Sequence, residues 1–201
     1  MPWQASAAPG VRRKILEGDG GEIARCTALV QHDPEVRLSP PRHDAGEEIF
    51  VIAGTLEDEQ GSYPAGTYLR NPPDAHHRHF TPTGCKLFVR LHQFQPGDDQ
   101  SVRVDTPRAG WSPGLVDGLT VLPLHSYRDE TVALVRWRPG TVFKGHAHFG
   151  GEEIFVVDGV FEDEHGRYPA GTWLRSPHMS VHTPSSRAGC LIYVRTGMLV
   201  T

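Results

Sequence analysis

Cysteine is scarce in this chain, with three residues in a sequence of 201. Three thiols are too few for the disulfide framework that holds small secreted domains together. Cys85 and Cys190 occur at equivalent positions of two similar apolar segments, so we expect buried thiols that act as small hydrophobic side chains. A redox role for Cys190 is the alternative.

The sequence also lacks an excess of positive charge and any long apolar run. Its formal net charge is −4 and its pI is about 6.3, which argues against the basic surface that nucleic-acid binding requires. No segment approaches the roughly 18 consecutive apolar residues of a membrane-spanning helix. Residues 1–10 lack the basic and apolar regions of a secretory signal. We therefore expect a cytoplasmic protein that binds neither nucleic acid nor membrane.

Glycine and proline, in contrast, are abundant, with 22 and 17 residues. They flank short apolar segments rich in β-forming side chains, such as residues 49–52, 131–137 and 191–195. No segment of ten or more residues shows the 3.6-residue period of an amphipathic helix. Short strands at regular spacing, with turns between them, predict an all-β sandwich or barrel.

A long segment of the sequence occurs twice. EEIFVIAGTLEDEQGSYPAGTYLRNP at residues 47–72 returns as EEIFVVDGVFEDEHGRYPAGTWLRSP at residues 152–177, with 18 of 26 positions identical and no gap. Such self-similarity indicates two copies of one fold. The polar segment 95–114 is the natural connection, so we predict two domains, at residues 1–107 and 108–201.

The second copy carries a set of metal-binding side chains. His146 and His148 are two residues apart and point to the same face if that segment is extended. Glu152 follows after the glycines of residues 150–151, which allow the chain to bend back, and His182 arrives from another strand. Three imidazoles and a carboxylate suit zinc and the neighbouring divalent transition metals.

The first copy is incomplete at the same offset, because Pro41 stands where the second copy has a histidine. His43, Glu47 and His77 remain, which is the composition of a two-histidine, one-carboxylate site. They are the candidate ligands of a second metal site. His79 is the substitute ligand if the segment around it shifts by one strand period.

The sequence pattern around the metal-binding residues of the second copy is G-x5-H-x-H-x3-E-x6-G, followed by P-x-G and a later histidine. It resembles the first and second motifs of the cupin superfamily. More narrowly, GEEIFVVDGVFEDEHGRYPAGTWLRSPHMSVHTP resembles the cupin-like domain of the anti-sigma factor ChrR family. The resemblance implies a bicupin of two jelly-roll β-barrels, with metal ligands at His146, His148, Glu152 and His182.

The chain departs from ChrR in lacking the His-x3-Cys-x2-Cys pattern of its helical, zinc-binding domain. In the ChrR family that domain binds the sigma factor, so we do not expect this chain to bind a sigma factor in the same way. Cupins also pair sheets between subunits, which makes a homodimer an expectation of the resemblance. The acidic runs at residues 57–59 and 162–164 are interpreted as solvated hairpin tips.

Four further residues of the second copy are expected near the metal, either lining the cavity or supporting its ligands: Phe143, Trp173, His178 and Tyr193. The resemblance implies a sensory or regulatory module that responds to an oxidant or a small ligand. The alternative is a non-heme Fe(II) dioxygenase that acts on a small diketone or hydroxyketone. Zinc is the first choice of metal, and Fe(II), Mn or Ni are the alternatives.

Overall fold

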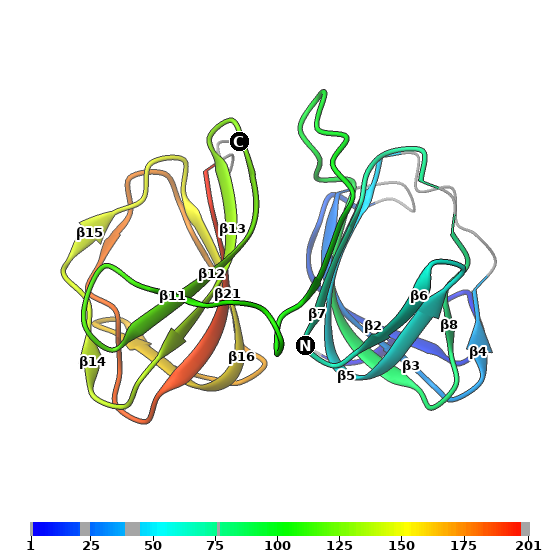
Figure 1. Ribbon diagram of the computed structural model, residues 1–201, viewed down its shortest axis with the longest axis horizontal. Helices are drawn as coiled ribbons and strands as arrows, with labels where there is room; N and C mark the ends of the chain where they lie inside the picture. The colour runs from blue at the N-terminus through cyan, green and yellow to red at the C-terminus, as the bar shows by residue number, and fades with distance from the viewer. Residues whose placement is uncertain (1, 21–24, 39–44, 76, 198–201) are drawn as a thin grey trace. The chain divides into compact units, whose positions relative to one another are not determined.

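The computed structural model describes residues 2–20, 25–38, 45–75 and 77–197, which form strands and turns (Figure 1). The prediction of an all-β chain built from two barrels is confirmed. No helix in the described part of the chain is long and apolar enough to cross a membrane. The chain divides into two compact units, Met1–Arg108 and Ala109–Thr201.

The first unit is an antiparallel arrangement in the order β1-β2-β3-β9-β5-β7-β10, with β6 and β8 paired to β5 and with β4 paired to β8. Its strands are β1 (Gln4–Ala5), β2 (Val11–Gly18), β3 (Cys26–His32), β4 (Val36–Arg37), β5 (Glu47–Asp58), β6 (Gly61–Pro64), β7 (Thr67–Asn71), β8 (Phe80–Thr81), β9 (Cys85–Leu91) and β10 (Val102–Asp105).

The second unit repeats this plan in the order β11-β12-β13-β21-β16-β20-β14, with β17 and β18 paired to β16. A separate two-stranded ribbon is formed by β15 and β19. The strands are β11 (Ser112–Pro113), β12 (Leu119–Tyr127), β13 (Glu130–Trp137), β14 (Thr141–Val142), β15 (His146–Ala147), β16 (Glu152–Asp163), β17 (Gly166–Pro169), β18 (Trp173–Ser176), β19 (Val181–His182), β20 (Ser185–Ser186) and β21 (Cys190–Thr196).

The longest strand of each unit, β5 or β16, bends at a glycine. Gly54 and Gly159 have φ angles of 75° and 73°, next to a register shift in the ladder with the neighbouring strand. A Cβ atom on Gly159 would lie 2.1 Å from the carbonyl oxygen of Gly189, so no other residue fits without rearrangement. Before the bend β16 pairs with β18 and β21, and after it with β17 and β20. One strand thus closes the barrel.

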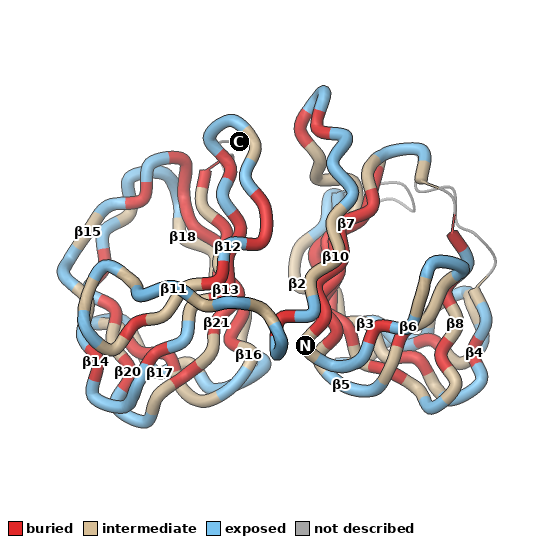
Figure 2. The backbone as a smooth tube through the Cα atoms, viewed as in Figure 1, coloured by how far each residue is buried: buried red, intermediate tan, exposed pale blue. Residues whose placement is uncertain are grey.

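Strand alternation decides which side chains of β16 enter the barrel. Ile154 and Val156 join an apolar core with Phe161 of the same strand and Ile192 of β21. The intervening Phe155 lies on the opposite face. Buried positions follow the central strands of each unit (Figure 2). Because Glu152 shares the phase of the core residues, its carboxylate is directed into the barrel.

Candidate metal centre

The side chains of the second unit's motif converge from three strands. His146 lies on β15 directly opposite His182 on β19, and His148 follows β15. Gly150 and Gly151 both have positive φ, at 80° and 85°, and turn the chain back into β16. The structure therefore brings together the predicted residues of this site, although they are 36 positions apart in the sequence.

Distances within the cluster are short. His146, His148 and His182 each offer a ring nitrogen, and these atoms lie within 4.8 Å of one another. The Nε2 atoms of His148 and His182 are 2.9 Å apart. The Oε2 atom of Glu152 is 3.4 Å from Nε2 of His148 and 3.5 Å from Nε2 of His182. His148, Glu152 and His182 are buried, and His146 is half-buried.

Several nitrogen and oxygen atoms of these side chains have lone pairs without a hydrogen-bond partner, and a cation could bind them. The Oε2 atom of Glu152 is buried and has no hydrogen-bond partner. Two Nε2 atoms that face each other can share only one hydrogen between them. His146 Nδ1–H donates to the carbonyl oxygen of Lys144 at 2.8 Å, which leaves its Nε2 lone pair free. A divalent ion held by the three imidazoles would use these nitrogen lone pairs, with the Glu152 carboxylate next to His148 and His182.

Protonation favours a metal at His148 and opposes it at Glu152. Burial, with the nearby His146 and His182, lowers the pKa of His148 to about 4, so its imidazole is neutral near pH 7. Burial, with the charge of Asp163, raises the pKa of Glu152 to about 8. Neutral imidazoles are the form that binds metals. The carboxyl of Glu152 must give up its proton when a cation binds.

A cavity of about 440 Å³ opens onto this cluster. One end carries the four polar groups described above. The walls are apolar, and among the described residues that line the cavity none is arginine or lysine. The wall residues include Leu119, Val135, Phe143, Ile154, Ile192 and Val194. Such a site suits a small, largely apolar molecule that reaches the metal with its polar end.

The four supporting residues predicted from the sequence lie in different places. Phe143 lines the cavity, with its ring edge-on to His146 at a centroid distance of 4.8 Å. Trp173 and Tyr193 both pair with Phe155, so they stand on the other face of the sheet; the expectation that they line the cavity is corrected by strand alternation. His178 is exposed and accepts a hydrogen bond from Gly150 N–H at 2.9 Å.

Sequence reasoning missed Asp163. Its acidic run was expected to be a solvated hairpin tip, but only 8% of the Asp163 side chain is exposed, and its Oδ2 atom lies 3.6 Å from Nδ1 of His182. The equivalent Asp58 is 1% exposed. A signal was available, since each aspartate is followed five residues later by a tyrosine that hydrogen-bonds to it.

The first unit assembles a different cluster. Glu47, His77 and His79 are buried, and their ligand atoms lie within 4.8 Å of one another. His77 Nε2 is 2.6 Å and His79 Nε2 is 3.4 Å from Oε1 of Glu47. The substitute ligand His79 therefore joins the predicted pair, whereas His43 lies outside the described residues.

Glu47 in this cluster is already satisfied by protein groups. The side-chain amide of Asn71 donates to Oε1 of Glu47 at 2.7 Å, and Arg103 of β10 in turn donates to Asn71. The position of Asn71 is Ser176 in the second copy. Burial acts to lower the pKa of His77, but its hydrogen bond to Glu47 and the charge of that carboxylate outweigh burial and raise the pKa. A proton shared with Glu47 thus competes with any metal.

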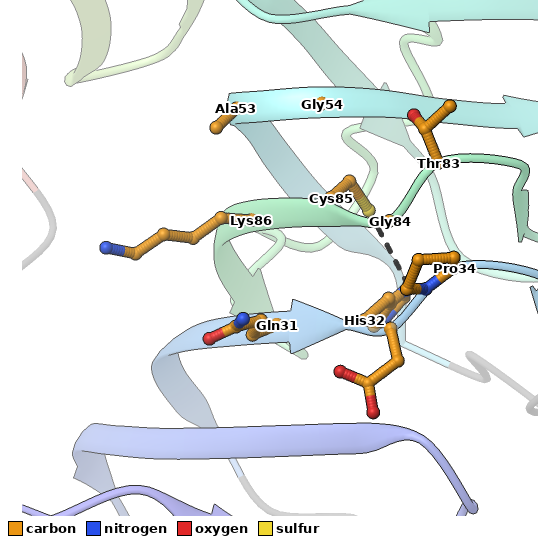
Figure 3. Close-up of a pocket in the computed structure, with 10 residues that line it drawn as sticks. Gln31, His32, Pro34, Ala53, Gly54, Thr83, Gly84, Cys85 and Lys86 are labelled. Atoms are coloured by element: carbon orange, nitrogen blue, oxygen red, sulfur yellow. Dashed lines mark hydrogen bonds between the residues drawn. The ribbon is translucent and has the colours of Figure 1, made fainter.

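Cys85 and Cys190 are buried free thiols. Cys85 and His32 line a pocket of about 430 Å³ in the first unit. The Cys85 Sγ atom lies 3.7 Å from Nδ1 of His32 (Figure 3). Burial raises the pKa of Cys85 to about 11 and, with the charge of His79, lowers that of His32 to about 4, so this pair stays neutral. Burial also raises the pKa of Cys190 to about 11, which keeps it as a thiol rather than a reactive thiolate.

Solved structures share the fold at low sequence identity. A protein from Nostoc punctiforme that is proposed to be a dioxygenase aligns with a TM-score of 0.80 and 15% identity, over 99% of this chain and 79% of its own. A proposed glyoxylate-induced protein from Pseudomonas aeruginosa gives 0.78 and 14%, over 99% and 85%. Oxalate decarboxylase from Lactobacillus farciminis gives 0.65 and 13%, over 99% and 84%. These likenesses establish the jelly-roll fold alone.

None of the curated proteins matches the sequence significantly. The family model described as the ChrR cupin-like domain matches the chain twice, at residues 1–95 and 99–200. The two matches follow the tandem repeat, and the expected resemblance is confirmed.

Proposed function

Because the chain belongs to the ChrR cupin-like family, we propose that its second unit is a metal-dependent enzyme that uses O₂ to cleave a small diketone or hydroxyketone. The observation that carries this proposal is the apolar cavity of about 440 Å³ that ends at three imidazoles and a carboxylate. A purely structural zinc site would have no need of a cavity that size beside it.

His146, His148 and His182 would hold the metal through their Nε2 atoms. Bound Fe(II) would supply the redox chemistry and the open coordination positions that O₂ and substrate need. The apolar walls exclude bulk water and hold the carbon chain of the substrate against Phe143 and Ile192. Glu152 begins β16, which is paired on both sides there, and two of the histidines lie on the β15–β19 ribbon; this pairing fixes their geometry before the metal arrives.

Glu152 has properties that suit a proton acceptor. Its Oε2 atom is buried at the metal end of the cavity and has no hydrogen-bond partner. A pKa raised to about 8 lies close to neutral pH, where general acid–base catalysis is most effective. In this proposal Glu152 either becomes a fourth ligand or takes the acidic proton from the carbon between two carbonyl groups.

The lining of the cavity supports a neutral substrate. Carboxylate substrates are usually bound by arginine or lysine, and neither type is present among the described lining residues. A neutral diketone or hydroxyketone instead presents two oxygens to the metal and an apolar remainder to the walls. The cavity volume accommodates a molecule of that size.

A second candidate is the sensory or regulatory module expected from the sequence, with zinc as its ion. Membership in the ChrR cupin-like family favours it, as does the Glu152 carboxylate beside His148 and His182, which would serve as a fourth protein ligand. An oxidant signal would then act at the metal centre, because the Cys190 pKa of about 11 leaves little thiolate to react. A cytoplasmic location and a homodimer are part of both proposals.

The two candidates are separated by metal analysis and oxygen uptake. The tag-free protein would be analysed by plasma mass spectrometry, then stripped, reloaded anaerobically with Fe(II) or Zn(II), and exposed to O₂ with pentane-2,4-dione or a phenolic ketone. Diketone-dependent O₂ uptake by the iron form alone supports the enzyme. Stoichiometric zinc without uptake by the iron form rejects the enzyme in favour of the sensor, and absence of any bound metal rejects both.

A further inference from the structure

Asp163, at the end of β16, is held by three hydrogen bonds. Its Oδ1 atom accepts three hydrogen bonds, from the backbone N–H groups of His165 (2.8 Å) and Gly166 (3.0 Å) and from the hydroxyl of Tyr168 (3.0 Å). These donors belong to the β16–β17 hairpin and fix the plane of the carboxylate. The Oδ2 atom is left to face the barrel interior, where His182 lies.

His182 is placed between this carboxylate and the metal cluster. Its Nδ1 atom is 3.6 Å from Oδ2 of Asp163, while its Nε2 atom is 2.9 Å from Nε2 of His148 and 3.5 Å from Oε2 of Glu152. The two ring nitrogens therefore face two different environments. One meets a fixed negative charge, and the other meets the atoms that would share a cation.

We propose that Asp163 is the positioning residue of the metal centre. It keeps the hydrogen of His182 on Nδ1 and thereby directs the Nε2 lone pair toward the metal. An N–H group on Nδ1 is attracted by the carboxylate, whereas a lone pair there is repelled, so the ring tautomer is set by this contact. This inference rests on the proposed metal centre but not on the reaction catalysed there.

The first unit has the same arrangement of an aspartate held by three hydrogen bonds of its hairpin. Its occurrence in both units indicates a conserved element of the repeat rather than a chance contact. Oδ1 of Asp58 accepts hydrogen bonds from the N–H groups of Gln60 (2.7 Å) and Gly61 (3.1 Å) and from the hydroxyl of Tyr63 (2.7 Å). Its Oδ2 atom is buried and lies 4.0 Å from Arg103. This hydrogen-bonded aspartate is therefore common to both units, and in the second unit it lies 3.6 Å from Nδ1 of His182.

Replacement of Asp163 by asparagine has a defined consequence. The three donors of the hairpin require an oxygen, so the asparagine must keep its carbonyl oxygen in the place of Oδ1. Its NH₂ group then faces Nδ1 of His182 and needs a lone pair there. The ring hydrogen moves to Nε2, which removes the lone pair that the metal needs.

The experiment compares wild type with Asp163→Asn and with the matched control Asp58→Asn. The control changes the equivalent hairpin aspartate in the other unit. In metal-free protein, long-range ¹H–¹⁵N correlation spectra report which ring nitrogen of His182 carries hydrogen. Zn(II) and Co(II) dissociation constants are measured by competition with a chromophoric chelator. We expect Nδ1–H in wild type and in Asp58→Asn, and Nε2–H in Asp163→Asn. Metal binding should weaken about 10–100-fold in Asp163→Asn only.

Several results would overturn the inference. Hydrogen on Nε2 of His182 in the wild-type protein would do so without any variant, which covers the case in which Asp163→Asn does not fold. Equal loss of affinity in both asparagine variants would assign the effect to hairpin stability. Failure of wild type to bind metal would reject the proposed centre, while the tautomer of His182 would still test the role of Asp163.

Discussion

His148 and His182 direct their Nε2 atoms at each other across 2.9 Å, although 34 residues separate them in the sequence. One imidazole follows β15 and the other ends β19, and the pairing of these strands produces the contact. Such close approach of two neutral bases is unfavourable without a shared hydrogen or cation. The pair therefore defines where a metal would sit.

Replacement of His182 by alanine should abolish metal binding and leave the barrel folded. The apolar core of the second unit is built without the ligands, so the fold does not depend on the ion as a zinc finger does. Plasma mass spectrometry and thermal unfolding of the variant test this. His178→Ala is the control: that exposed residue accepts a hydrogen bond from Gly150 N–H and packs against Phe149, and the variant should keep full metal content.

Metal affinity should rise with pH between about 6 and 8. In the free site the pKa of Glu152 is about 8, so below that pH a bound proton must leave before the carboxylate meets a cation. Each unit of pH then changes affinity by up to roughly tenfold, and the slope vanishes above pH 8. His148, with a pKa of about 4, titrates below this window.

Chelator competition at several pH values measures this slope. Glu152→Gln should bind metal with a flatter dependence over the same range, because the titrating group is gone. An equal slope in wild type and variant would show that another group controls the proton release.

A bulky residue in the cavity wall should separate ligand binding from metal binding. Val135 lines the cavity but belongs to β13, away from the ligand strands. Val135→Phe should keep one metal per chain and lose at least about tenfold in binding or turnover of the diketone, because the ring fills the space that a ligand needs. Val157→Phe, on a half-buried residue that does not line the cavity, is the comparison.

The first unit should bind metal only after Glu47 is released from its protein partners. We expect His182→Ala protein to retain no metal, because Asn71 and His77 already occupy Oε1 of Glu47. Adding Asn71→Ser, the residue of the second copy, should raise the residual metal content. Residual metal in His182→Ala that disappears with His77→Ala would instead show that the first cluster is a working site.

The bend of β16 makes a stability prediction with an internal control. At Gly159, alanine would combine a positive φ with a Cβ atom 2.1 Å from a carbonyl oxygen, and should lower the free energy of unfolding by at least about 2 kcal/mol. Gly171 also has positive φ but has no atom within 4 Å of an added Cβ, so alanine there should cost about 1 kcal/mol. Urea denaturation of both variants compares them; equal losses would contradict the clash.

The fold was predictable because it is specified by short sequence patterns that occur in both repeats. The repeat at an offset of 105, the alternation within β5 and β16, and the spacing of turns all follow from short stretches of sequence. The convergence of His146, His148 and Glu152 was predictable for the same reason, since strand period and a glycine turn place them. His182 was predicted to join them from a different strand, as the later histidine of the same repeat.

The remaining features depend on tertiary packing that local patterns do not encode. An acidic run reads as solvated whether or not a neighbouring strand covers it, so the burial of Asp163 was missed. Trp173 and Tyr193 are aromatic residues near the motif, and only strand register reveals that they share the face of Phe155 rather than that of Ile154. Likewise, the contact of Arg103 with Asn71 requires β10 to pair with β7.

The ribbon of β15 and β19 pairs only with itself among the described strands, yet it carries two of the imidazoles directly and the third immediately after it. A cation bound by this ribbon and by Glu152 of β16 would cross-link the ribbon to the barrel wall. Chelation would then loosen the ribbon without melting the sheets. Proteolysis and amide exchange should therefore detect metal loss at Ala147 and Val181 while β13 and β21 stay protected.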